Sequence, residues 1–149
     1  MKSDVTALSG RCHCGNIELV FETELPIDRL PLRACACSFC SSHGARCTSD
    51  PQGRVRITIQ DTDRLSRYQF GLKAADFLVC KTCGVYVGAL LTEDDSAWAT
   101  VNVNAFEPSD GLGRNPVTVT YDAETEEERR ARRKKAWTPA VLEFRAFAP

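Results

Sequence analysis

Eight cysteines fall mainly into three short clusters, and this pattern constrains the fold more than any other feature of the 149 residues. The clusters are a C-x-C pair, a C-x-C-x-x-C triplet and a C-x-x-C pair: Cys12 and Cys14; Cys35, Cys37 and Cys40; Cys80 and Cys83. Cys47 stands alone. The N-terminus lacks the apolar core of a secretory signal, so we expect a cytoplasmic protein with reduced thiols. Reduced cysteines at such spacings indicate metal binding or catalysis rather than disulfides.

The two outer pairs have the spacing of a structural zinc site. One or two spacer residues let a tight turn present two thiolates to one ion, and four thiolates complete the tetrahedral shell that zinc prefers. Glycine follows the second cysteine of each pair, at Gly15 and Gly84, where it helps the turn reverse. We therefore pair Cys12 and Cys14 with Cys80 and Cys83 as a closed structural zinc site.

The middle cluster predicts a second zinc ion of a different kind. Cys35, Cys37 and Cys40 lie within six residues, so all three can reach one ion and leave its fourth position open. An open position is typical of a catalytic zinc, and these three cysteines would carry the chemistry. The alternative is that Cys47 or His43 closes the site and makes it structural.

The rest of the chain predicts a mainly β fold of antiparallel strands. Short apolar or alternating runs are separated by turn residues, at 17–22, 55–60, 77–79, 85–91, 98–103, 117–121 and 141–144, with Tyr68 and Phe70 suggesting another strand. One short C-terminal surface helix is expected at about 124–136. Thr125 and Glu128 form a capping box there, and Glu126–Arg130 and Glu128–Arg132 are i,i+4 pairs.

Length and charge narrow the classes of partner. The length fits one domain, 1–149, with the helix as an insertion. A net charge of -1 and the lack of a long apolar run give no reason to expect a membrane partner. The basic run 129–135 follows four glutamates, which favours a solvated helix over nucleic-acid binding. Exposed strand edges are compatible with a homodimer.

Three motifs together resemble those of the glutathione-dependent formaldehyde-activating enzyme family, whose domain also occurs in a vertebrate centromere protein. They read GRCHCG at 10–15, CACSFC at 35–40 followed by HGA at 43–45, and FLVCKTCGV at 77–85. The likeness runs from about residue 10 to residue 106 and includes AWTP at 136–139. It implies a β-tent zinc fold, two zinc ions and a carbon–sulfur lyase, with the outer cysteines structural and the middle ones catalytic.

The resemblance also implies a reaction and its substrates. Such an enzyme joins formaldehyde to glutathione, as S-(hydroxymethyl)glutathione synthase does, or runs in reverse. Sequence candidates for a donor to the aldehyde oxygen are Ser38, Ser41, Ser42 and His43. Arg33, Arg46, Arg54 and Arg56 are candidates to meet the carboxylates of glutathione. The alternative function is a non-enzymatic zinc-binding module for protein or nucleic-acid interaction.

Overall fold

The computed structural model describes residues 4–108 and 111–145, and within them the chain is mainly β, as predicted. The strands are β1 (Thr6–Arg11), β2 (Ile17–Thr23), β3 (Arg33–Cys35), β4 (Cys47–Thr48), β5 (Arg54–Ile59), β6 (Leu65–Tyr68), β7 (Asp76–Cys80), β8 (Tyr86–Glu93), β9 (Ser96–Asn102), β10 (Val117–Val119) and β11 (Thr138–Phe144). The helices are α1 (Ser38–His43) and α2 (Glu126–Ala136), with 3-10 turns η1 (Ile27–Arg29), η2 (Thr62–Arg64) and η3 (Val103–Ala105). No helix within these residues is long and apolar enough to span a bilayer.

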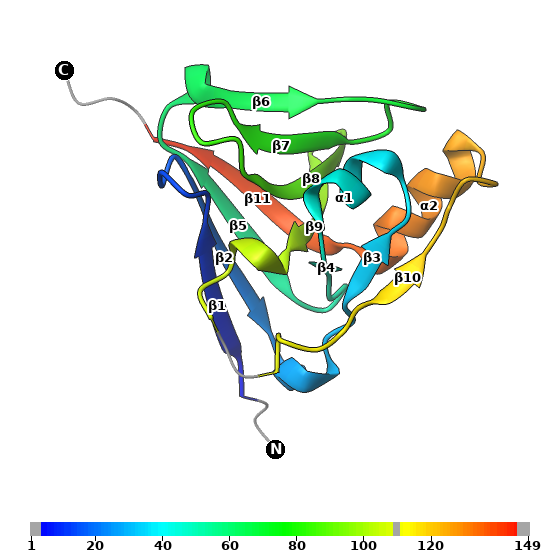
Figure 1. Cartoon of the computed structure of the whole chain (residues 1–149), viewed down its shortest axis with the longest axis horizontal. Helices are drawn as coiled ribbons and strands as arrows, with labels where there is room; N and C mark the ends of the chain where they lie inside the picture. The colour runs from blue at the N-terminus through cyan, green and yellow to red at the C-terminus, as the bar shows by residue number, and fades with distance from the viewer. Residues whose placement is uncertain (1–3, 109–110, 146–149) are drawn as a thin grey trace.

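All the strands join one sheet, whose main path is β1-β2-β5-β11-β9-β4-β3-β10. From β9, a second path continues through β8 and β7 to β6. The prediction of antiparallel pairing is wrong at two places, because β11 runs parallel to β5 and β10 runs parallel to β3. Long connections make this possible, since a parallel partner needs a crossover rather than a tight turn. Figure 1 shows β1 and β2 at one end of the molecule and α2 beside β10 at the other.

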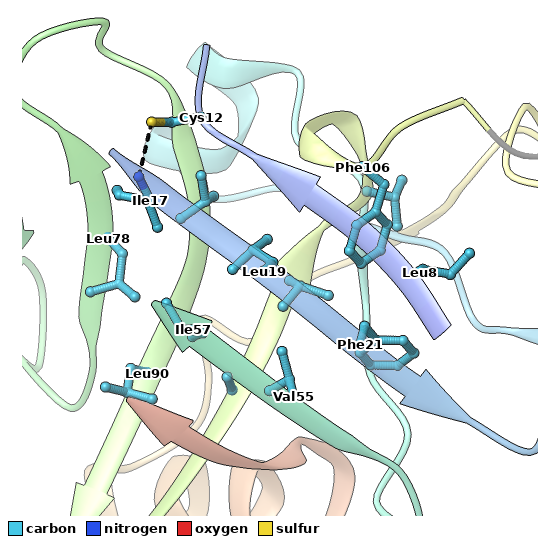
Figure 2. Packing of buried hydrophobic residues seen from close by; sticks show 14 of the residues in the cluster. Leu8, Cys12, Ile17, Leu19, Phe21, Val55, Ile57, Leu78, Leu90 and Phe106 are labelled. Carbon is cyan, nitrogen blue, oxygen red and sulfur yellow. Dashed lines mark hydrogen bonds between the residues drawn. The ribbon is translucent and has the colours of Figure 1, made fainter. Parts of the chain in front are cut away.

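The main core lies under the β1–β2–β5 layer. Ile17, Leu19 and Phe21 alternate with polar residues on β2 and are fully or almost fully buried. Leu19 pairs with Ile57 across the sheet, so the apolar faces of β2 and β5 coincide. Figure 2 shows these side chains together, with the Cys12 sulfur at the end of the same row. The alternation in the sequence therefore predicts the buried face correctly.

Helix α1 is an element that the sequence analysis does not predict. Its first turn is capped by Cys37, whose sulfur accepts a hydrogen bond from the Cys40 backbone N–H at 3.4 Å. Gly44 ends it in the left-handed conformation, with φ of 57°. The sequence does not predict this helix because it is short and its serines leave no apolar periodicity. A helix this short is not stable alone, so it depends on the cysteine cap and on its packing.

Helix α2 forms where it is predicted, and its capping box between Thr125 and Glu128 is confirmed. The predicted i,i+4 ion pairs are wrong: Arg130 pairs with Glu93 at 3.3 Å, and Arg132 with Glu124 at 2.8 Å. Both acids lie outside the helix, and the two arginine side chains pair with them instead of with the glutamates of the first helical turn. Only part of α2 is exposed as a surface helix, because Arg133 on its inner face is buried.

Candidate metal centres and the cavity beside the cysteine triplet

Two turns that are far apart in sequence bring four cysteines together. Cys12 and Cys14 lie in the turn between β1 and β2, whereas Cys80 ends β7 and Cys83 lies in the turn that follows it. Their sulfur atoms all fall within 4.8 Å of one another, and we call this group the four-cysteine cluster. Cys14 Sγ lies 3.8 Å from Cys12 Sγ and 3.5 Å from Cys80 Sγ. The spacing thus predicts correctly which cysteines meet.

The backbone of both turns is folded around these sulfurs. Backbone N–H groups of Ile17 and Cys83 donate to Cys12 Sγ at 3.3 Å and to Cys80 Sγ at 3.5 Å. Gly15 and Gly84 adopt φ of 87° and 78°, which a side chain would disfavour, so glycine lets each turn close. Arg64 adds a side-chain hydrogen bond to Cys14 Sγ at 3.2 Å. Such N–H···S contacts stabilise negative charge on sulfur, as a metal-binding thiolate requires.

The triplet of Cys35, Cys37 and Cys40 forms a second group with all three sulfurs within 4.8 Å. Cys35 ends β3, Cys37 caps α1 and Cys40 lies in the first turn of that helix. A hydrogen bond from the Cys40 thiol lowers the pKa of Cys35 to about 5, although burial opposes the change, and the charge of Arg132 also lowers it. The group therefore favours at least one thiolate at neutral pH, the form that binds a metal ion.

Neither of the residues weighed as a fourth ligand belongs to this group in the described part of the chain. Cys47 is half-buried beside Tyr86, and loss of solvation raises the pKa of its thiol to about 12. The Nδ1 of His43 lies 2.9 Å from the Phe39 carbonyl oxygen, and its ring packs on those of Phe39 and Tyr86. The described residues thus supply this centre with three sulfurs rather than four.

A cavity of about 130 Å³ opens beside the triplet, and we call it the triplet cavity. Its wall includes all three triplet cysteines, Cys47, and the buried rings of Tyr86 and Trp137. Burial raises the pKa of Tyr86 well above its ordinary value, with nearby Cys47 acting in the same direction. Tyr86 therefore stays protonated at neutral pH and presents a phenolic hydrogen-bond donor.

Five cationic side chains also line the triplet cavity: Arg33, Lys73, Arg129, Arg132 and Arg133. Of the four arginines suggested by the sequence, Arg33 alone lines it. Arg46 instead donates to Asn104 and to the Leu112 and Arg114 carbonyl oxygens. The sequence analysis misses Tyr86 and three of the four arginines of α2, Arg129, Arg132 and Arg133. The only sequence signal for the arginines is the spacing of residues 129, 132 and 133, which places them on one face of the helix.

Two of the three serines suggested as donors, Ser41 and Ser42, are hydrogen-bonded to nearby backbone carbonyl oxygens. Ser42 Oγ donates to the Ser38 carbonyl oxygen at 2.7 Å, and Ser41 Oγ to that of Ala36 at 3.4 Å. Both serines are exposed, as is Ser38. The residues lining the cavity in the described part of the chain do not include His43 or these serines.

A crystal structure of a Rhodobacter sphaeroides protein, a Northeast Structural Genomics target, is similar to this chain. The two are 28% identical with a TM-score of 0.57, and the match covers 76% of this chain and 99% of that one. No protein-family model and no curated protein matches the chain. The comparison therefore shows a shared fold and leaves the activity to be argued from the site.

Proposed function

We propose that this chain is a zinc-dependent carbon–sulfur lyase that adds an aldehyde to a small thiol, or reverses that addition. The observation that carries the proposal is a triplet of sulfurs close enough to share one metal ion, on the wall of a cavity, with neither Cys47 nor His43 in its set. A closed four-thiolate centre holds a fold together, whereas three protein ligands leave a position for a reactant.

The donor sets suit zinc. A tetrahedral zinc site with bonds of ~2.3 Å has sulfur atoms ~3.8 Å apart, and the separations of 3.8 and 3.5 Å in the four-cysteine cluster agree with that. Soft thiolate ligands also favour zinc over magnesium or calcium. Cys12, Cys14, Cys80 and Cys83 would hold the structural ion, and Cys35, Cys37 and Cys40 the second. When bound there, zinc would favour the thiolate form of an incoming thiol.

In the proposed addition, the thiol sulfur bonds to the aldehyde carbon as the carbonyl π bond breaks, and the thiol proton ends on the oxygen. Tyr86 is the cavity residue suited to stabilise that oxygen, because its buried phenol remains protonated and is a hydrogen-bond donor. Phe77, Tyr86 and Trp137 give the cavity an apolar, aromatic wall. Reversal uses the same contacts with the proton moving back to sulfur.

The test measures exchange between free glutathione and its formaldehyde adduct by NMR exchange spectroscopy, because the uncatalysed addition is already fast. We expect metal-loaded protein to accelerate the exchange in proportion to its concentration, and Cys37→Ser to return the rate to the uncatalysed value. The control is Arg130→Gln, whose arginine pairs with Glu93. Fully metal-loaded protein that leaves the exchange rate unchanged, with formaldehyde or with a panel of other small aldehydes, would refute the proposal.

A further inference from the structure

Arg133 is a buried cation with no direct ion-pair partner in the described part of the chain. Its side chain lies on the inner face of α2 and lines the triplet cavity, and the residue is only 9% exposed. Its guanidinium carbon lies 4.8 Å from the centre of the Trp137 ring. Its Nε has no hydrogen-bond partner among the described residues. A buried charge in this condition costs several kcal/mol of folding free energy unless an anion joins it.

The nearby carboxylate of Glu124 is already paired with two other arginines. Glu124 accepts from Arg132 at 2.8 and 3.1 Å and lies 3.5 Å from Arg129 Nε. Arg132 is also stacked on the Tyr121 ring at 3.4 Å, which fixes its position. One carboxylate therefore serves two guanidinium groups, and a net positive charge remains around the third.

The net charge of the whole cavity wall is also positive. Five lining side chains are cationic, and they outnumber the negative groups, which are Asp122 and the thiolate that the triplet favours. Burial, together with repulsion from Arg132 and Arg129, lowers the pKa of Arg133 to about 10, so the group is still charged at neutral pH. An arginine fork binds a planar oxyanion through two parallel hydrogen bonds. The wall is therefore suited to an anion that arrives with a ligand.

We propose that Arg133 is the anion-binding residue of the triplet cavity and that the ligand is a small organic acid whose carboxylate it receives. Arg129 and Arg132 add to the positive potential, and Trp137 holds the guanidinium in place. The volume of about 130 Å³ fits a ligand of only a few heavy atoms inside the cavity, since a cavity of ~150 Å³ holds a molecule of benzene size. That this acid also carries a thiol for the triplet rests on the proposed function.

The test is the shift in melting temperature of metal-loaded protein at constant ionic strength, with chloride as the matched anion. Four probes separate the two parts of the ligand: propionate carries the carboxylate alone, mercaptoethanol the thiol alone, mercaptopropionate both, and inorganic phosphate a competing oxyanion. We expect propionate to raise the melting temperature above the chloride value and mercaptopropionate to raise it further. A stabilisation by phosphate larger than by propionate would overturn the assignment to a carboxylate.

Substitutions in α2 test whether Arg133 is the residue that binds the anion. Arg133→Met removes the charge and keeps the length of the side chain, so we expect affinity for propionate to fall about tenfold or more while the ligand-free protein becomes no less stable. Arg133→Lys keeps the charge without the fork, and we expect an intermediate loss. The matched control, Arg130→Gln, changes a neighbouring arginine that pairs with Glu93 and should bind propionate as the wild type does.

The outcomes for anion binding and for the proposed function are distinct. Propionate binding that depends on Arg133, without any effect of mercaptoethanol, would support the anion site and count against the thiol chemistry. Propionate binding that survives in both Arg133→Met and Arg133→Lys would overturn the anion site, whatever the thiol does. So would a propionate effect in the wild type no larger than that of chloride.

Discussion

At the scale of single residues, Cys37 has two separable roles. Its sulfur caps α1 by accepting the Cys40 N–H, and it is also a member of the triplet. Serine is itself a good N-cap residue, so Cys37→Ser should retain the helix and lose the ligand. We expect the purified variant to contain about one metal ion fewer per chain, with an unchanged far-ultraviolet circular dichroism spectrum. Elemental analysis of the protein measures the metal content.

The comparison variant for that experiment is Cys80→Ser. Cys80 is buried, and it belongs both to the four-cysteine cluster and to the main core. A structural metal site contributes folding free energy directly, so this variant should unfold at a much lower denaturant concentration. Equal loss of stability in Cys37→Ser and Cys80→Ser would mean that both centres are structural.

Cys47 is the residue on which the open centre depends. The residue is half-buried, loss of solvation raises the pKa of its thiol to about 12, and it lies outside the triplet set. We expect Cys47→Ser to keep the metal content of the wild type and to lose about 1 kcal/mol of unfolding free energy, because a hydroxyl is less apolar than a thiol. Loss of one metal ion from this variant would instead identify Cys47 as the fourth ligand.

At the scale of elements, Glu124 forms ion pairs that join the segment just before α2 to two arginines of the helix. Its carboxylate is 19% exposed and contacts Arg132 and Arg129. The hydrogen bond from Arg132 is the largest cause that lowers the pKa of Glu124, and burial opposes it. We expect Glu124→Gln to lower the free energy of unfolding by about 1 kcal/mol at pH 7, since the pairs are partly buried and hydrogen-bonded. Urea denaturation measures this difference.

The same pair predicts a pH dependence with a definite sign. A carboxyl group whose pKa is lower in the folded state stabilises that state above its unfolded pKa, and the effect disappears as pH falls through the folded value. The ordinary value is 4.5. The difference between wild type and Glu124→Gln should therefore be constant from pH 7 to about 6 and shrink below 4.5. A difference that grows on acidification would contradict this ion pairing.

Elements also show why sequence reasoning predicts one part of the site and misses another. The cysteine clusters are predictable because a turn of a few residues fixes where each thiol points, whatever the rest of the chain does. The place of Arg133 is not predictable, because α2 is polar on nearly every face and its sequence has no apolar stripe to show which face meets the sheet. Helix α1 is missed for a related reason, since its cap is a cysteine rather than an ordinary capping residue.

At the scale of the whole molecule, the two centres belong to different parts of the core. Cys12 and Cys80 pack in the larger apolar cluster with Leu19, Phe21 and Leu78. The triplet packs in a second cluster, in which Cys40 lies with Tyr86 and Trp137. The four-cysteine cluster joins the β1–β2 turn to the β7–β8 turn, which are distant in sequence, so its ion would constrain far more of the chain than the triplet's ion does.

This division predicts that metal removal proceeds in two steps. Three thiolates beside a cavity should release their ion to a chelator before the four thiolates of the four-cysteine cluster do, because four ligands hold an ion more tightly and Cys12 and Cys80 are buried in the larger core. We expect a chelator titration to remove about one ion per chain with little loss of β-sheet signal, and the second only as the sheet melts. A metal-sensitive dye follows release, and circular dichroism follows the fold in the same sample. Cys37→Ser should lack the first step alone; simultaneous loss of both ions and of the sheet in the wild type would show that the centres act as one structural unit.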